Sequence, residues 1–329
     1  MKNLLTRRYV FSAFAAASLI ALGSVPVYAQ AQYPSGPVRI VHPFPPGNAN
    51  DTTLRLIAER LSQRWKQPVT IDNRPGASSM IGTTFVAQAP ADGLTLLANI
   101  TLIVQNPALR PKLPYDPAKI VPVTQINRQQ LSFYVRSDLG IDSATQLFAL
   151  AQAQPGKINF ASWGIASTAH IILAKMEQDK GIKMTHVPYK GGADIVKALA
   201  SGEADIAVGD LITPSAFFKN GKFKLLAVTG PKRVAHLPDV PTLEEVGVKG
   251  FEGYNWLGLF APAGTSPAII KKISDDIAAV QSDPALLARF RDEMFVDPTA
   301  TGPEEFQKIY QRDATTWTSL IKATGLKAE

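Results

Sequence analysis

The sequence predicts an α/β fold in two domains, and three observations favour it. Short β-branched or apolar runs alternate with segments of helical periodicity, which is typical of a largely parallel sheet. A start made of strand, loop and helix occurs twice, near residue 45 and near residue 165. The last helical segments have no strands of their own. We therefore expect them to pack back on the first domain, which becomes discontinuous, with two crossings between the domains.

The first 29 residues have the pattern of a secretory signal peptide. Arg7 and Arg8 precede an almost uncharged run from Tyr9 to Val25, and a small residue ends the segment at Ala29. We expect cleavage after Ala29 and export to the periplasm, by the Sec route rather than the twin-arginine route.

Composition narrows the classes of function. Removal of the predicted signal peptide takes away three basic residues and no acidic one, so the net charge falls from +7 to +4. The mature chain of 300 residues, out of 329, is long enough for two domains with large cores. With no cysteine in the chain, disulfides, thiol catalysis and Cys-zinc sites are excluded. The mild, scattered basic charge suits a small acidic ligand better than nucleic acid.

The first domain begins with a strand from Val38 to Val41, a loop rich in Pro and Gly, and a helix from Thr52 to Gln63. A second strand is expected at 69–72, followed by a turn over 73–79 and a helix carrying Ile81, Phe85 and Val86. A third strand is expected at 95–98.

The second domain is expected to contain strands at 131–135, 158–161, 206–208 and 225–228, and helices at 143–154, after 168 and at 193–201. A further extended run at 256–260 leads into the C-terminal helices. We place the first domain at 30–128 plus 257–329 and the second at 129–256.

Both strand–loop–helix starts are suited to hold an anion. The first backbone N–H groups of a helix have no partner within the helix, and the macrodipole adds roughly half a positive charge there. Asp51 is expected to cap its helix rather than contact a ligand. Asp210 follows an apolar strand, where either a site role or a loop turn is reasonable.

Other chemistry lacks its signatures. We find no G-x-G-x-x-G after a strand, no Walker A sequence and no G-x-S-x-G elbow. His42, His170, His186 and His236 are widely spaced, so each is expected to be structural or on the surface rather than a metal ligand or a catalytic base. We expect no metal, no cofactor and no enzymatic activity.

Several short segments that contain Pro, Gly, Asn or Asp resemble those of one protein family. They are Val41 to Gly47 with Asp51, Asn73 to Ala77, Ala91 to Leu96, Asn106-Pro107, Leu113 to Pro117, His186 to Gly192, Leu237 to Thr242 and Ala261 to Thr265. In this order they resemble the Bug-type (TctC-like) periplasmic solute-binding proteins of tripartite tricarboxylate transporters. The resemblance covers essentially the whole mature chain.

The resemblance implies a two-lobed, type II-like periplasmic-binding-protein (Venus flytrap) fold with two crossover strands, which binds a small carboxylate between its lobes and delivers it to membrane permease subunits. A monomer is expected. The ligand-binding residues that it implies are Phe44, Pro46, Gly47, Asn48, Ala49, Asn50, Asp51, Ala77, Ser78, Asn99, Trp163, Gly164, Ser167, Thr168 and Asp210. Ser167 and Thr168 could cap their helix, present hydroxyls to an anion, or do both. Trp163 could be core or a wall of the site.

The chain departs from the family pattern in both loops. The second Gly of the first loop is Asn48, the next residue type that tolerates positive φ. Pro46 has no N–H to donate. In the second loop a Gly is replaced by Ala166, and Trp163 stands where a small residue is usual. We therefore expect an aromatic or short apolar monocarboxylate, or a compact dicarboxylate, rather than a tricarboxylate.

Two other functions remain open. A ligand-presenting adaptor for a membrane sensor kinase would have the same features, and the sequence does not separate it from a transport receptor. A periplasmic hydrolase or isomerase would need an activated nucleophile or a paired acid and base, and neither is visible.

Overall fold

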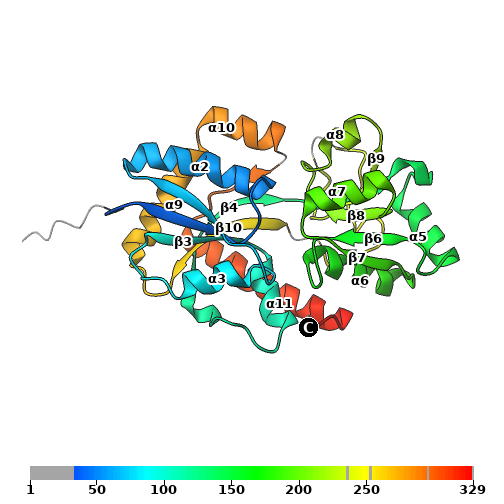
Figure 1. The fold of residues 1–329 in the computed structure, drawn as a ribbon, viewed down its shortest axis with the longest axis horizontal. Helices are drawn as coiled ribbons and strands as arrows, with labels where there is room; N and C mark the ends of the chain where they lie inside the picture. The colour runs from blue at the N-terminus through cyan, green and yellow to red at the C-terminus, as the bar shows by residue number, and fades with distance from the viewer. Residues whose placement is uncertain (1–32, 235–236, 252–253, 295, 328–329) are drawn as a thin grey trace, which may run out of the picture.

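The computed structural model describes residues 33–234, 237–251, 254–294 and 296–327. The predicted signal peptide and His236 lie outside the described residues. Two α/β lobes stand side by side, each built on its own sheet (Figure 1). The predicted α/β class is confirmed. None of the described helices has both the length and the hydrophobicity needed to cross a bilayer.

Lobe 1 contains a six-stranded sheet in the order β11-β4-β10-β3-β1-β2. Its strands are β1 Val38–His42, β2 Val69–Asn73, β3 Thr95–Ile100, β4 Ile120–Gln129, β10 Asn255–Pro262 and β11 Asp297–Pro298. Strand β1 pairs in parallel with β2 and β3, whereas β10 runs antiparallel to β3 and β4. The carboxyl ends of β1 and β3 therefore meet at one edge, which faces lobe 2.

Helices cover both faces of this sheet (Figure 1). They are α2 Ala49–Trp65, α3 Met80–Ala87, α4 Leu102–Leu109, α9 Pro267–Gln281, α10 Pro284–Ala288 and α11 Pro303–Thr324, with short 3-10 and π turns at Pro117–Lys119 and Arg289–Glu293. Ile40 faces one core with Leu54 of α2, and Val41 faces the other with Phe306 of α11. Successive strand residues point to opposite faces, so a sheet buried on both sides reads as a continuous apolar run.

Lobe 2 contains a five-stranded sheet in the order β7-β6-β8-β5-β9. Its elements are β5 Ser132–Arg136, β6 Asn159–Ser162, β7 Thr185–Pro188, β8 Ile206–Gly209 and β9 Phe223–Val228, with helices α5 Ala144–Ala153, α6 Thr168–Lys180, α7 Gly192–Ser201 and α8 Ser215–Lys219 and a 3-10 turn at Ser137–Leu139. Strand β6 is parallel to β7 and β8. The loops after β6, β7 and β8 therefore lie at one edge of the sheet.

The chain crosses between the sheets twice, from β4 to β5 and from β9 back to β10. The two crossings are joined where Leu131 N donates to Thr229 Oγ1 at 2.8 Å and Thr229 N donates to Leu131 O at 2.8 Å. The predicted boundaries after 128 and 256 fall inside β4 and β10, so they stay predictions.

Helix α11 packs differently from the prediction, which assigned the whole C-terminal segment to lobe 1. Phe306 and Tyr310 pack in lobe 1, but Leu320 and Ile321 pack into the core of lobe 2. In Figure 1 this red helix extends from beneath lobe 1 to the side of lobe 2. One helix thus contributes to both cores.

Candidate functional site

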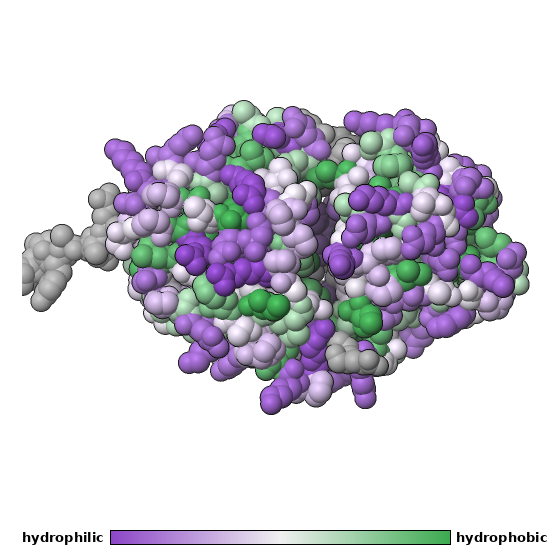
Figure 2. Space-filling model, in the orientation of Figure 1, coloured by the Kyte–Doolittle hydropathy of each residue, from purple (hydrophilic) through white to green (hydrophobic). Residues whose placement is uncertain are grey.

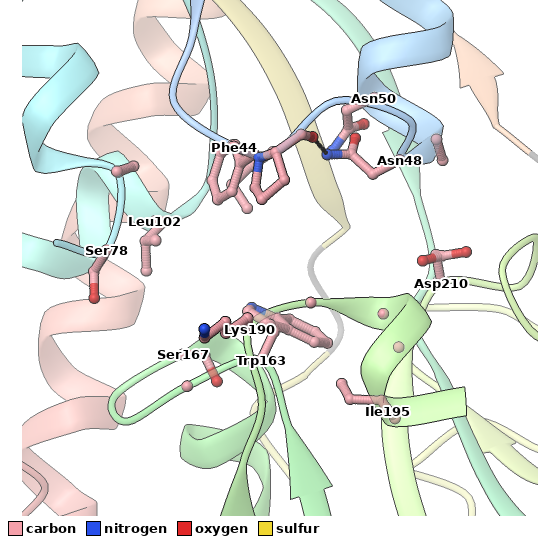
Figure 3. A pocket seen from close by; sticks show the side chains of 18 of the residues that line it. Phe44, Asn48, Asn50, Ser78, Leu102, Trp163, Ser167, Lys190, Ile195 and Asp210 are labelled. Carbon is pink, nitrogen blue, oxygen red and sulfur yellow. Dashed lines mark hydrogen bonds between the residues drawn. The ribbon is translucent and has the colours of Figure 1, made fainter. Parts of the chain in front are cut away.

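A cavity of about 600 Å³ opens between the lobes. The space-filling view shows the groove that separates them (Figure 2), and Figure 3 shows side chains from both lobes directed into it. The lining residues are Pro43, Phe44, Pro45, Asn48, Ala49, Asn50, Pro75, Gly76, Ser78, Ser79, Ile100, Leu102, Gln129, Leu131, Tyr134, Trp163, Gly164, Ile165, Ser167, Lys190, Gly191, Gly192, Ile195, Gly209, Asp210 and Asn255.

The first binding loop, residues 43–48, joins β1 to α2. Its left-handed residue is Gly47, with φ +86°. Asn48 is extended, with φ −80° and ψ 169°, and its Oδ1 accepts from Asp51 N at 2.9 Å as the helix N-cap. Two expectations are therefore wrong. Asn48 does not adopt a positive φ, and Asp51 is not the cap, because α2 begins at Ala49 rather than Thr52.

Asp51 instead braces this loop from behind. Its carboxylate, 2 % exposed, accepts from Gly47 N at 2.9 Å, from Arg55 Nε at 2.9 Å and from Asn73 Nδ2 at 2.9 Å. Burial alone would raise the pKa of Asp51, but the hydrogen bonds from Arg55, Gly47 and Asn73 hold that pKa below its usual value. An ionised Asp51 thus fixes the loop to α2 and β2.

A second loop of lobe 1 leads into α3. Ala77, Ser78 and Ser79 all have positive φ, between 46° and 73°. Ser78 is held through its carbonyl by Asn106 Nδ2 at 2.9 Å and through its hydroxyl by Arg110 Nη2 at 3.0 Å. Helix α4 therefore fixes a conformation that non-glycine residues adopt only under constraint.

Asn99, at the end of β3, supports the same loop from the interior. It is fully buried, and its Nδ2 lies 3.3 Å from Ser79 Oγ and 3.1 Å from Thr83 Oγ1. Its amide is used within lobe 1, so it holds α3 rather than facing the cavity.

The second binding loop, residues 162–167, joins β6 to α6. Gly164 has φ +125° and Ala166 has φ +58°. Ser167 is the N-cap of α6, and its hydroxyl accepts from His170 N at 3.4 Å. Ser167 therefore caps its helix and also lines the cavity. Trp163 is partly buried against the core of lobe 2 and also lines the cavity, so it is both core and wall.

Thr168, the next residue, faces away from the cavity. Its hydroxyl lies 3.0 Å from Gln105 Nε2 and 3.1 Å from Gln105 Oε1. Both side chains are buried. Gln105 belongs to α4 of lobe 1, so this contact ties the helix of the second binding loop to the opposite lobe.

The loop after β8 presents Asp210. Its Oδ1 accepts from Thr213 N at 2.6 Å and from Ile212 N at 3.0 Å, which closes a turn, and the residue also lines the cavity. Asp210 therefore closes a loop turn and also lies at the cavity, the two positions that the sequence left as alternatives. The buried Tyr134 lies beside it, and burial together with the charge of Asp210 raises the pKa of Tyr134, which stays a neutral phenol.

Helix α7 also brings its N-terminus to the cavity. Gly191 is its N-cap, Gly192 is its first residue, and both line the cavity with Lys190. The first residues of α2, α6 and α7 or their caps all face this space, and their dipoles favour an anion. The described residues contain no cluster of His, Cys, Asp or Glu that could hold a metal ion.

The cavity walls between these polar ends are apolar. In Figure 3, Phe44 and Leu102 come from lobe 1, and Trp163 and Ile195 come from lobe 2. This arrangement can hold a small molecule that has an anionic end and an apolar body.

The predicted site residues divide into two groups. Those that line the cavity are Phe44, Asn48, Ala49, Asn50, Ser78, Trp163, Gly164, Ser167 and Asp210. Those outside its lining are Pro46, Gly47, Asp51, Ala77, Asn99 and Thr168. In the second group, Gly47, Asp51, Asn99 and Thr168 support the loops.

Several lining residues were not predicted from the sequence, among them Tyr134, Lys190, Gly192 and Ile195. A signal existed for Lys190 and Gly192, because they separate the strand that ends at Pro188 from a helix that was correctly expected. This segment is a third unit of strand, loop and helix, like the two that the sequence predicts near residues 45 and 165. Tyr134 gave no such signal, because it lies inside an apolar strand and comes beside Gly209 only through the pairing of β5 with β8.

Comparisons with known proteins agree with this geometry. The model of the tripartite tricarboxylate transporter family receptor matches residues 53–326. Protein BugT of Bordetella pertussis is 30% identical over 298 residues, which is 90% of this chain and 91% of BugT. A protein encoded in the tcbD–tcbE intergenic region of Pseudomonas sp. strain P51 is 31% identical over 298 residues, 90% of this chain and 88% of that protein.

Solved structures are similar over nearly their whole length. An R. palustris protein with adipate has a TM-score of 0.84 and 30% identity, covering 90% of this chain and 99% of that chain. The periplasmic binding protein BugD has a TM-score of 0.82 and 29% identity, covering 90% and 100%. MatC from Rhodopseudomonas palustris with bound malate has a TM-score of 0.79 and 26% identity, covering 88% and 100%. The predicted two-lobed periplasmic-binding-protein fold is thus confirmed.

Proposed function

This chain belongs to the family of tripartite tricarboxylate transporter receptors, the Bug-type periplasmic solute-binding proteins, and we propose that it captures a small organic carboxylate between its two lobes. The observation that carries the proposal is the convergence of helix N-termini from both lobes on one cavity, because the caps or first residues of α2, α3 and α4 in lobe 1 and of α6 and α7 in lobe 2 line it. Adipate and malate in two similar structures support a carboxylate ligand.

The charge of the cavity supports one or two carboxylates rather than three. Lys190 and Asp210 are the charged side chains among the described lining residues, and their formal charges cancel. The remaining attraction comes from helix termini, roughly half a positive charge each. We therefore propose an aromatic or short apolar monocarboxylate, or a compact dicarboxylate, held between Phe44 and Trp163.

Thermal denaturation in the presence of a carboxylate panel tests the proposal. The panel contains benzoate, hexanoate, adipate, malate and citrate. A true ligand at about 100 times its Kd adds about 2.7 kcal/mol of apparent stability. Benzoate, hexanoate, adipate or malate should raise the melting temperature more than citrate does. An unchanged melting temperature with the entire panel would argue against carboxylate capture.

A negative charge added to the cavity wall supplies the matched variant. Asn50 is the second residue of α2, lines the cavity, and has an Oδ1 atom that is buried without a hydrogen-bond partner. Asn50→Asp keeps the shape and suits the helix dipole, but it places a negative charge beside the ligand carboxylate. We expect at least a tenfold loss of affinity, about 1.4 kcal/mol, with little change in stability.

The control is Gln146→Glu, the same chemical change in the exposed first turn of α5, away from the cavity. This variant should bind the same carboxylate as tightly as the wild type. Equal loss in both variants would point to net charge rather than to the site.

We further propose that the chain is exported to the periplasm, works as a monomer and passes its ligand to membrane permease subunits. The exported chain should begin at Gln30, and deletion of its gene should abolish uptake of the labelled carboxylate. Recovery of the ligand unmodified after incubation with the protein would support binding without catalysis.

A further inference from the structure

Two histidines lie stacked directly behind the second binding loop. The rings of His170 in α6 and His186 in β7 have centroids 3.8 Å apart and planes inclined by 15°. Fifteen intervening residues hide this pair in the sequence, but the pairing of β6 with β7 brings them together. Neither residue lines the ligand cavity, so the role proposed above does not use them.

Each ring holds one part of the second binding loop. His186 Nε2 lies 2.6 Å from Ser162 Oγ, and that hydroxyl also accepts from Gly164 N at 3.1 Å. His170 Nδ1 accepts from Ala166 N at 3.0 Å. The two rings therefore hold the loop at Ser162 and at Ala166. Trp163 and Ile165, which line the cavity, lie between these two points.

The contact to Ala166 holds a strained residue. Ala166 has φ +58°, in a region that costs a non-glycine residue about 1–2 kcal/mol. A backbone in this conformation persists only when its surroundings constrain it. The N–H of Ala166 has the unprotonated Nδ1 of His170 as its acceptor, so the neutral state of that imidazole is part of the constraint.

The surroundings of the pair keep both rings neutral. Burial lowers the pKa of His170, which lies in the first turn of α6, where the helix dipole also disfavours a cation. Burial and the neighbouring His170 lower the pKa of His186 to about 4. Glu177 and Lys183 are the charged residues that face the pair across a hollow of about 300 Å³, and they form an ion pair with each other at 3.0 Å.

We propose that His170 and His186 are positioning residues that hold the second binding loop in its ligand-binding conformation, and that a proton gained by the pair releases that loop. The inference rests on the proposed function. A protonated Nδ1 cannot accept from Ala166 N.

Substitutions that keep or remove the ring contacts test the positioning role at about pH 7. His170→Asn and His186→Gln each keep a polar atom near the position of the nitrogen that they replace. His170→Leu and His186→Leu remove it. With adipate and benzoate as probes, we expect the Leu variants to lose at least fivefold in affinity and the Asn and Gln variants to stay within about twofold of the wild type.

The pH profile distinguishes positioning from simple packing. As the pH falls from about 7 toward 4, molecules in which His170 gains a proton lose the contact to Ala166 N, so the apparent affinity of the wild type should fall about twofold or more relative to the double variant His170→Asn/His186→Gln. Comparison at each pH cancels titration of the probe and of cavity side chains. Identical profiles for the two proteins would overturn the proposal.

A readout without ligand separates this inference from the proposed function. In protein labelled with 5-fluorotryptophan, the ¹⁹F resonance of Trp163, assigned with Trp163→Phe, should shift or broaden between about pH 7 and pH 4 in the wild type and not in the double variant. If it moves while no carboxylate binds, the inference stands and the proposed function fails. If carboxylates bind but the resonance is unchanged by pH and by the Leu substitutions, the inference fails.

Discussion

The two binding loops have the same plan but different supports. In lobe 1, residues 43–48 are held by the ionised Asp51, which takes hydrogen bonds from Gly47, Arg55 and Asn73. In lobe 2, residues 162–167 are held by two neutral imidazoles, His170 and His186. Each loop ends at a side-chain N-cap, Asn48 in α2 and Ser167 in α6.

The same strand–loop–helix arrangement can thus be held by an ionised side chain, as in lobe 1, or by neutral side chains, as in lobe 2. The carboxylate of Asp51 must stay ionised to accept its three donors, so it fails only in strong acid. The Nδ1 of His170 must stay unprotonated to accept from Ala166 N, so this support fails when the histidine pair gains a proton. We therefore expect the two sides of the cavity to respond to different pH conditions.

The largest expected effect comes from removing the charged support. Asp51→Ala leaves Gly47 N and Asn73 Nδ2 without their acceptor and Arg55 without its partner. We expect a loss of about 2–3 kcal/mol in unfolding free energy, below the range for a fully buried pair because half of Arg55 is exposed. Urea denaturation measures it, and carboxylate affinity should fall with it.

Asp275→Ala is the control for that experiment. Asp275 forms an exposed ion pair with Lys271 in α9, where the loss should be below about 0.5 kcal/mol. If Asp51→Ala cost no more than this, the ionic support of lobe 1 would not exist as described.

The next effect tests whether the loop of lobe 2 is also tied to lobe 1. Thr168→Val keeps the shape but leaves the buried amide of Gln105 without its hydroxyl partner. We expect a loss of about 1–2 kcal/mol, measured by urea denaturation. Thr315→Val, on the exposed side of α11, should change stability by less than about 0.5 kcal/mol. Similar losses would mean that the cross-lobe contact adds nothing.

Acid should weaken the two supports in separate windows. The pKa of His186 is lowered to about 4, so the unfolded chain takes up the proton first, near pH 6.5. Stability from this residue is complete above pH 6.5 and is lost as the pH falls toward 4. Because the pKa of Asp51 is also lowered, its contribution is present above pH 3.8 and is lost as the pH falls further.

Between pH 6.5 and 4 the wild type should lose unfolding free energy, and we expect this loss to be about 1–2 kcal/mol smaller in His186→Gln, allowing for the partial exposure of the ring. Urea midpoints across this range measure it. Asp51→Asn should leave the pH dependence of the unfolding free energy unchanged between pH 6.5 and 4 and alter it only below that range. A steeper slope for His186→Gln than for the wild type would contradict the neutral support.

The smallest effect concerns backbone conformation in the two loops. Gly47 has φ +86° with open space beside it, so Gly47→Ala should cost about 1 kcal/mol. Ala166 already takes a positive φ, so Ala166→Gly should change stability by only about 0 to 1 kcal/mol, in the stabilising direction. Thermal midpoints measure both. If Gly47→Ala were neutral, the first loop would tolerate either conformation.

Local patterns in the sequence were sufficient for much of the fold. The helix over 143–154 was expected from its periodicity and is present as Ala144–Ala153, capped by Ser143. Strands β3, β5 and β9 were also expected from short apolar runs. The ten-residue strand β4 was not, because Pro122 and several polar residues interrupt its pattern, and only its pairing with β10 makes it a strand.

The sequence by itself determined the α/β class and, through punctuated segments such as Val41 to Gly47, the family. It also located the two strand–loop–helix segments whose loops line the cavity, because Pro, Gly and cap residues act on their own neighbours. Only the tertiary structure decided which side chains face the cavity and which support it. Asp51 turns toward Asn73, Thr168 toward Gln105, and His170 onto His186, each across a gap in the sequence. Such contacts depend on strand order and helix packing, which no local pattern encodes.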